Sequence, residues 1–172
     1  GVQTCALPIS RGISAFKSNF DSCDYNNIYK RGSVGYIAYE DQVNTYCDTL
    51  AAWQTASLWD NNSISQDPRF VDLTGDAADF DYHIKSQGGH WNESTTSWTQ
   101  DAVSSPCLDA GDPSVNVNAG DFSENENNGD RINIGGYGGT QFASLTPQLV
   151  TGDKPLDTTV TLYINGVEQA SD

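Results

Sequence analysis

The sequence predicts an all-β chain with one short helix, and three observations favour this fold class. Short stretches in which apolar and polar residues alternate recur along the chain, as in DFDYHIK at 79–85, and a period of two is typical of β-strands. Clusters of Gly, Asn, Asp and Ser separate these stretches and are typical of turns. A single segment, DTLAAWQTASLW at 48–59, changes to helical spacing.

The first half of the chain predicts short strands on either side of that helix. Residues 21–39 alternate small apolar and aromatic residues with Asn, Ser and Gly, which indicates strands broken by turns. Because its apolar residues recur at helical spacing, we expect a helix over Thr49–Ala56, with Asp48 or Thr49 as its N-cap. The segment NSISQDPRFVD at 62–72 returns to extended chain, because its proline keeps the preceding residue out of the α region.

The second half begins with the clearest strand of the sequence. Phe80, Tyr82 and Ile84 alternate with polar residues, so they share one face of a half-buried strand. Trp91 and Trp98 stand on either side of the turn-like NESTT, which predicts a β-hairpin or a loop excursion. The proline- and glycine-containing segment SPCLDAGDP then predicts a compact turn.

A long polar segment precedes the last strand of the main domain. Residues 114–130 have almost no large apolar side chains, so we expect a surface loop there. Arg131–Ile134 predicts one more strand, with Ile132 and Ile134 on one face. The glycines of 135–139 then end it.

The composition changes near the C-terminus and indicates a domain boundary. We expect a main domain over 10–145, a proline-containing linker over 146–156, and the truncated start of a second β domain, Ig-like or similar, over 157–172. Alternating apolar residues lead to an Asn-Gly pair at 165–166, and this dipeptide is a strong hairpin signal.

Charge and hydropathy exclude several classes of partner. The formal net charge is −15, from 8 Lys and Arg against 23 Asp and Glu. Nucleic acids and anionic membrane surfaces bind basic patches, so neither is an expected partner. No apolar run approaches the roughly 18 residues of a membrane span. We therefore expect a soluble monomer without membrane insertion.

The N-terminus and the cysteines need separate treatment. Residues 1–9, GVQTCALPI, resemble the translation of a sequencing adapter, and we exclude them and Cys5 from the fold prediction. Cys23, Cys47 and Cys107 remain, without a CxxC motif or a histidine at zinc-ligand spacing. Two alternatives stay open, a Cys23–Cys47 disulfide or three buried thiols.

Four motifs in order carry a family resemblance. YCDTLAAWQTAS, NSISQDPRFVD, SPCLDAGDP and GDRINIGGYGGTQFAS together resemble the C-terminal end of bacterial right-handed parallel β-helix proteins of the pectate-lyase-like superfold, over about 21–144. The resemblance implies a right-handed parallel β-helix for residues 10–145 and a secreted or cell-surface location. It implies no single activity, because this group includes polysaccharide lyases, hydrolases, adhesins and members without an assigned role.

The glycine-rich segment RINIGGYGGT at 131–140 suits the end of such a solenoid. A solenoid coil cannot bury its apolar face alone, and its last coil needs a polar cap over open strand edges. We expect Ile132 and Ile134 to close the stack, the glycines to form sharp corners, and Tyr137 to cover the apolar end. The Walker A and GxGxxG phosphate motifs both lack a required residue here.

The acidic loop is the candidate metal site. Calcium takes six to eight oxygen ligands in flexible geometry, and a calcium site is predicted at Asp109, Asp112, Asp121, Glu124, Glu126 and Asp130. A solvated acidic loop is the alternative. Pairing of Asp109 with Arg131, as an internal contact of the cap, is a further one.

Aromatic residues give the candidate carbohydrate site. Tyr82, Trp91 and Trp98 could form a platform for sugar rings, because tryptophan and tyrosine combine an apolar body with a polar group. Packing of the hairpin onto the domain is the alternative. His83 and His90 lack a nucleophile partner in the sequence, and we interpret them as surface residues.

No catalytic residue is assigned. Asp79 and Asp81 share a strand face, as the carboxylates of a glycosidase could, and Arg69 and Lys85 are the nearby cations, but such pairs are common on solvated strands. Two hypotheses remain. One is a non-catalytic fragment with a structural, adhesive or glycan-binding role. The other is the C-terminal part of a polysaccharide lyase or glycoside hydrolase that acts on acidic polysaccharide, its active site mostly outside this fragment.

Overall fold

Short strands and one helix make up the regular structure of this chain. The structure, a computed structural model, describes residues 13–15, 23–33, 35–40, 43–118, 120, 123–148, 163–164 and 167–168. The elements are β1 (Ile13–Ala15), β2 (Ala38–Glu40), β3 (Thr45–Cys47), α1 (Leu50–Ser57), β4 (Phe70–Asp72), β5 (Asp81–Ile84), β6 (His90–Asn92), β7 (Ser97–Thr99), β8 (Tyr163–Ile164) and β9 (Val167–Glu168). Turns and loops therefore form most of the described chain.

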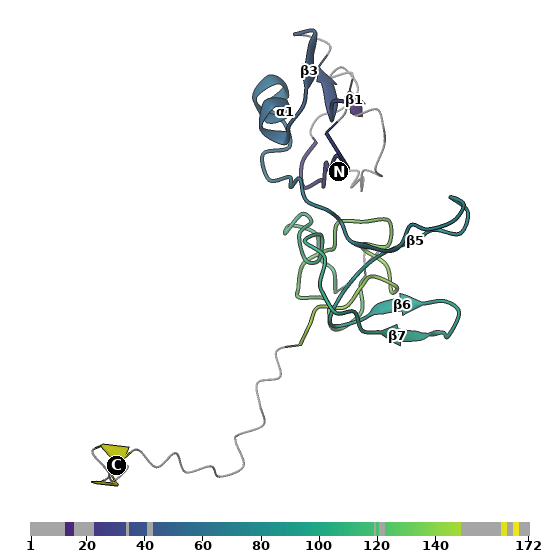
Figure 1. The fold of residues 1–172 in the computed structure, drawn as a ribbon, viewed down its shortest axis with the longest axis vertical. Coiled ribbons are helices and arrows are strands. Elements are labelled where there is room, and N and C mark those ends of the chain that lie inside the picture. The colour runs from purple at the N-terminus through teal and green to yellow at the C-terminus, as the bar shows by residue number, and fades with distance from the viewer. Residues whose placement is uncertain are drawn as a thin grey trace.

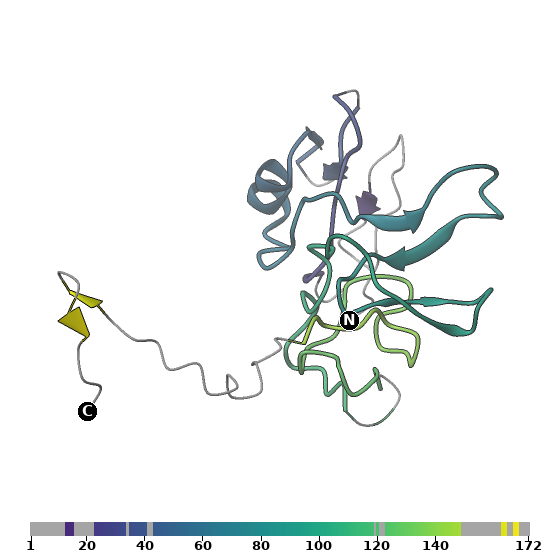
Figure 2. The same cartoon turned by 60° about the horizontal axis from the view of Figure 1, so that its bottom comes forward.

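The strands pair in small separate sheets. β1 pairs with β2 in parallel and β2 with β3 in antiparallel fashion. β4–β5, β6–β7 and β8–β9 are antiparallel pairs. The first sheet and α1 lie at one end of the described core and β6–β7 at the other, with β5 between them (Figure 1). The β4–β5 and β6–β7 hairpins project from the same side of the molecule (Figure 2).

The predicted right-handed parallel β-helix is wrong for the described part of the chain. Apart from β1–β2 and a single bridge between Asn27 and Ile64, the described pairings are antiparallel. The reason lies in the connections: short loops join β4 to β5 and β6 to β7, whereas a parallel pair needs a crossover of about a dozen residues or more. The interpretations as a pectin-lyase-like protein or an adhesin depended on the solenoid. They are wrong for the same reason.

The predicted strand at Arg131–Ile134 is also absent, although its burial was anticipated. Ile132 and Ile134 are buried, but their backbone groups bind different segments. The Gly111 amide donates to the Ile132 carbonyl at 2.8 Å, and the Ile134 amide donates to the Cys107 carbonyl at 2.9 Å. The alternation of apolar and polar residues thus identified which side chains are buried. It did not identify the segments to which their backbone groups are hydrogen-bonded.

The predicted helix is present, shifted by one residue. α1 begins after Thr49, whose Oγ1 accepts a hydrogen bond from the Ala52 amide at 3.2 Å, as an N-cap does. It ends at Ser57 and is followed by the C-cap Leu58, which has a left-handed φ of 62° and donates its amide to the Gln54 carbonyl. Trp53 is buried on the face that packs against β2 and β3. No helix in the described part is long and apolar enough to cross a membrane.

Two apolar clusters form the core. The first joins α1 to the first sheet through Ile28, Ile37, Ala38, Cys47 and Trp53. The second lies below β4–β5 and consists of Phe70, Ile84, Cys107 and Ile134, with Tyr82 among the half-buried residues packed on it. Each cluster unites residues far apart in the sequence, so burial of apolar area contributes to joining these short elements.

A buried carboxylate connects the first cluster to the chain around it. Asp60 accepts hydrogen bonds from Trp53 Nε1 at 2.7 Å, Asn26 Nδ2 at 2.7 Å and Ser63 Oγ at 2.6 Å. Its amide donates to the Cys23 carbonyl, and its φ of 58° lies in the left-handed region. We call these five residues the Asp60 network. A buried charge is tolerated only when its oxygens are bonded in this way.

The main domain accounts for nearly all the described residues. Residues 1–9 lie outside the described part, and so does most of 146–172. Within that C-terminal range, β8 and β9 pair with Tyr163 opposite Glu168, which fits the hairpin predicted from the Asn-Gly pair. The domain boundaries and the adapter origin of residues 1–9 stay predictions.

The Asp60 network yields a stability prediction. Asp60→Ala leaves the buried donors of Trp53, Asn26 and Ser63 without their acceptor, so we expect it to lower the free energy of unfolding by about 3 kcal/mol. Urea denaturation followed by tryptophan fluorescence measures the change. Asp79→Ala, at an exposed carboxylate, is the control and should stay within about 0.5 kcal/mol of the wild type. Equal midpoints for the two variants would contradict this role of Asp60.

Candidate functional site

The β4–β5 register brings two cations together. Phe70 pairs with Ile84, and the Lys85 amide donates to the Arg69 carbonyl at 2.9 Å, so Arg69 and Lys85 are neighbours across the hairpin. Arg69 has a left-handed φ of 52°. Its amide donates to Asp67 Oδ1 at 2.9 Å, a local side-chain contact that stabilises such a turn.

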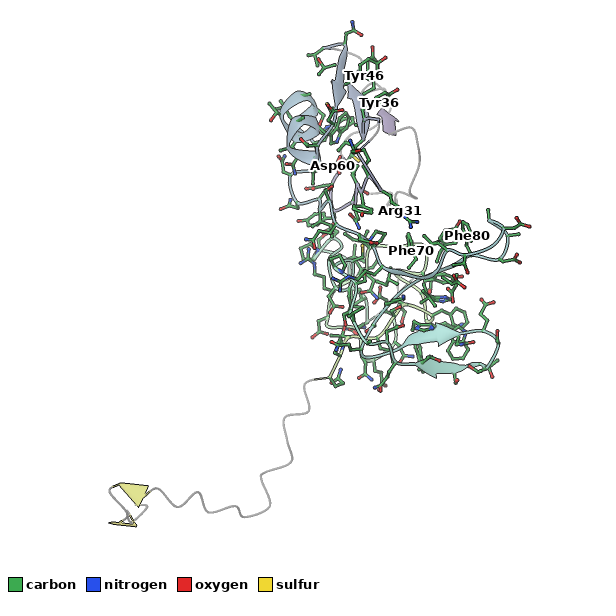
Figure 3. All side chains as sticks on the ribbon, in the orientation of Figure 1. Arg31, Tyr36, Tyr46, Asp60, Phe70 and Phe80 are labelled. Carbon is green, nitrogen blue, oxygen red and sulfur yellow. The ribbon has the colours of Figure 1, made fainter. Side chains whose placement is uncertain are left out.

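These two cations line an open cleft of about 580 Å³, and Arg31 is the third cation there. Arg31 comes from the segment that follows Ile28, far from β4 in the sequence. Figure 3 shows Arg31 close to Phe70. Tyr29, Phe70 and Val103 add apolar surface to the lining. We call this site the cationic cleft.

The two carboxylates of the cationic cleft are engaged by their own turns. Asp67 accepts the Arg69 amide, and Asp72 accepts the Thr74 amide at 2.8 Å. Hydrogen bonds from Thr74 and, to a lesser degree, the charge of Lys85 hold the pKa of Asp72 below its ordinary value. The lining therefore contains three cations and two locally bonded carboxylates.

The aromatic hairpin, which we define as β6–β7 with Trp91 and Trp98, brings two of the three predicted carbohydrate residues together. Trp91 and Trp98 pair across the strands with ring centroids 5.5 Å apart and an interplanar angle of 70°. Phe142 packs against Trp91 at 5.4 Å. Tyr82 lies elsewhere, with its ring 5.6 Å from that of Phe70. The predicted three-residue platform is thus not formed.

Both histidines are buried, so their interpretation as surface residues is wrong. His83 Nδ1 lies 2.7 Å from Asp81 Oδ1, and His90 Nδ1 lies 2.8 Å from Asp101 Oδ2. The His83 ring also stacks on Tyr137 at 3.6 Å. Asp81 is only two residues from His83, but the sequence gave no sign of the contacts with Asp101 and Tyr137, which are more distant in the chain.

The described residues offer these histidines no exposed reactive position. The carboxylate that orients His83 is of the kind found beside acid–base histidines, but the His83 Nε2 atom is buried and has no hydrogen-bond partner among the described residues. Asp81 is occupied by His83, and Asp79 faces back into its own loop, 3.8 Å from the position of a Cβ on Gly75. The pair Asp79 and Asp81 therefore does not form a two-carboxylate site.

The acidic loop contains a buried carboxylate rather than solvated ones alone. Glu124 Oε1 accepts the amides of Asn133 and Gly139 at 2.9 and 2.8 Å. Burial raises the pKa of Glu124, although these two hydrogen bonds oppose the rise. Gly138 is required nearby, because a Cβ there would lie 2.1 Å from the Asn133 carbonyl oxygen. Glu124 thus holds the glycine-rich turn in place, which sequence reasoning missed.

The other predicted calcium ligands have separate local partners. Asp109 accepts Thr146 Oγ1 at 2.9 Å, Asp112 accepts the Ser114 amide, and Asp130 accepts Asn118 Nδ2. Burial raises the pKa of Asp109, whereas the hydrogen bonds of Ser114 lower that of Asp112. Glu126 is exposed, and Asp121 lies outside the described residues. No group of three acidic, histidine or cysteine side chains suited to a metal occurs in the described part, and calcium binding stays a prediction.

Two further alternatives from the sequence are decided by contacts. Arg131 donates from Nε and Nη2 to the carbonyls of Gly111 and Ala110 at 2.6 and 3.1 Å, so it binds the backbone rather than Asp109. Cys23, Cys47 and Cys107 are free thiols. Burial raises the pKa of Cys23 to about 11, and it raises the pKa of the other two as well. These thiols are therefore poor nucleophiles.

Comparison with known proteins gives one partial match. The sequence profile of the family described as Disaggregatase related matches residues 37–111, less than half of the chain. This range runs from β2 to the turn after Cys107 and contains α1, β4–β5 and the aromatic hairpin. No curated protein and no solved structure matches the chain.

Burial of Glu124 and Asp109 predicts a pH dependence of stability. Both pKa values are raised from ordinary values of 4.5 and 3.8, so the unfolded chain releases these protons at lower pH than the folded one. Their contribution to stability is present below those ordinary values and is lost as the pH rises through the folded values. Glu124→Gln removes one of the two groups. We expect its unfolding free energy, relative to wild type, to increase between about pH 4 and pH 7.

Chemical denaturation at a series of pH values measures this difference. Glu126→Gln removes the same charge from an exposed position of the loop and controls for net charge. If the unfolding free energies of Glu124→Gln and the wild type differ by the same amount at every pH, then protonation of Glu124 does not contribute to the pH dependence of stability.

Proposed function

We propose that this chain is a non-catalytic glycan-binding part of a secreted or cell-surface protein. The single observation that carries the proposal is the aromatic hairpin, where Trp91 and Trp98 pair across β6 and β7 and Phe142, from a separate segment, packs against Trp91. Trp91 and Trp98 are half-buried, so part of each ring remains available for the apolar faces of sugar rings. The partial match to the Disaggregatase related family does not bear on this role.

Pre-organisation of the hairpin supports this proposal. His90, at the start of β6, is bonded to Asp101, and Asp101 Oδ2 also accepts the Ser86 amide at 2.8 Å. At the turn, the Asn92 side chain accepts the amides of Ser94 and Thr95. Rings on a rigid hairpin lose little conformational entropy when a ligand binds, which favours affinity. Because their planes are 70° apart, the two indoles do not form one continuous flat platform for a sugar ring.

The enzymatic alternative has no comparable support among the described residues. A glycosidase needs two carboxyl groups on either side of the scissile bond. Asp60 is bound by hydrogen bonds that hold the fold, and so is Oε1 of Glu124, whose buried Oε2 has no hydrogen-bond partner among the described residues. Glu40, a third buried carboxylate, lies at the end of β2, far in the sequence from Glu124. Binding is therefore the function that this geometry supports best.

Glycan binding is tested by removing one indole. Trp98→Ala should weaken binding of an oligosaccharide identified from a panel of neutral and acidic glycans by about tenfold, which corresponds to about 1.4 kcal/mol. Titration calorimetry measures the dissociation constant. Trp98→Phe keeps an aromatic ring and should restore most of the affinity.

Tyr46→Ala is the matched control, because Tyr46 is an exposed aromatic residue on the β2–β3 hairpin, with 62% of its surface accessible. It should bind as the wild type does. Failure of every glycan in the panel to bind the wild type, or equal binding by Trp98→Ala, would contradict the proposed function.

A further inference from the structure

We propose that the cationic cleft binds the negatively charged groups of an acidic glycan. This inference rests on the proposed function, because it takes the ligand to be a glycan, but it concerns a different surface and adds the charge of the ligand. The aromatic hairpin would contact the apolar faces of sugars, and the cationic cleft would contact carboxylate or sulfate groups.

The distribution of charge is the first argument. The chain has a formal net charge of −15, yet three of its five described cations, Arg31, Arg69 and Lys85, line one cleft. The other two are engaged elsewhere: Lys30 Nζ donates to the Gly35 carbonyl at 2.8 Å, and Arg131 binds two carbonyls. Most of this chain repels anions because of its acidic charge. Three cations gathered in one cleft create a local positive potential that can bind an anion, which the same cations spread over the surface would not.

The geometry of the three cations is the second argument. Arg69 is held by the donation of Nη1 to the Ser104 carbonyl at 2.6 Å, which leaves its other guanidinium N–H groups for a ligand. Lys85 is fixed at the neighbouring position by the strand register. Arg31 joins them in the lining from a separate segment. Guanidinium groups bind carboxylates and other planar or tetrahedral oxyanions through paired hydrogen bonds, and an ammonium adds a point charge.

The form of the cleft is the third argument. It is open and about 580 Å³ in volume, a size within the range of small-molecule sites. Tyr29, Phe70 and Val103 supply apolar contacts beside the charges, as a sugar ring with a charged substituent requires. With Asp67 and Asp72 counted, the lining has a formal charge of +1 on a chain of net charge −15, and both carboxylates accept amides of their own turns.

The test compares three oligosaccharides of equal length: a uronate, a sulfated and a neutral one. Binding is measured by calorimetry with a chelator present, so that calcium cannot bridge acidic groups. We expect the wild type to bind at least one acidic oligosaccharide more tightly than the neutral one. The uronate and sulfated arms distinguish carboxylate from sulfate as the source of the charge, and preference for either over the neutral arm supports the proposal.

Substitutions locate the site. Arg31→Gln and Lys85→Gln together should weaken binding of the acidic oligosaccharide by about tenfold or more and leave binding of the neutral one unchanged. Lys30→Gln removes one positive charge at the residue before Arg31, outside the cleft lining, and should stay within about twofold of the wild type. Each single variant, Arg31→Gln or Lys85→Gln, makes the same charge change as this control and should weaken binding more than it does. Thermal unfolding confirms that the variants are folded.

Three results would overturn the inference: equal affinity for neutral and acidic oligosaccharides, full affinity in the double variant, or an equal loss in Lys30→Gln. If Trp98→Ala still weakens binding of the neutral oligosaccharide in that case, the proposed glycan-binding function stands and only the role of the cationic cleft is rejected. Absence of binding to all three oligosaccharides would reject both.

Discussion

The carboxylate of Asp60 is the constraint on which the first half of the structure depends. Strands of three residues and a helix of eight bury too little surface to fix one another by apolar contact alone. Asp60 binds the indole of Trp53 from α1, the amide of Asn26 from the preceding segment and the hydroxyl of Ser63. A single buried charge thereby sets the position of three segments, since any other arrangement would leave it without partners.

That constraint extends to the cationic cleft. The segment that begins at Asn26 continues to Tyr29 and Arg31, and the segment after Ser63 continues to β4, and residues of both line the cleft. Backbone hydrogen bonds between Asn26, Ile28 and Ile64 join the two segments directly. The hydrogen bonds of the Asp60 network therefore help to bring together cations that are far apart in the sequence. Charges held in position bind a ligand at a lower entropic cost than mobile ones.

Local features of the fold were predictable from the sequence, and tertiary ones were not. The helix after Thr49 and the hairpin between Trp91 and Trp98 follow from spacing and turn residues within one segment. The solenoid did not follow, because alternation shows which side chains are buried but not whether the neighbouring strand is parallel. The cationic cleft and the burial of Glu124 depend on residues tens of positions apart, and a single sequence has no local signal for such contacts.

The most direct test of the central role of Asp60 is native-state hydrogen exchange at the amides of Asn26, Asp60 and Ile64. These amides donate to Ser63 Oγ, the Cys23 carbonyl and the Asn26 carbonyl, so all three belong to the segments that the carboxylate joins. We predict that they exchange with one common opening free energy, equal to that of global unfolding, because the segments can separate only when the buried charge is exposed. Independent exchange of the three amides, at free energies near those of exposed loops, would contradict this view of the fold.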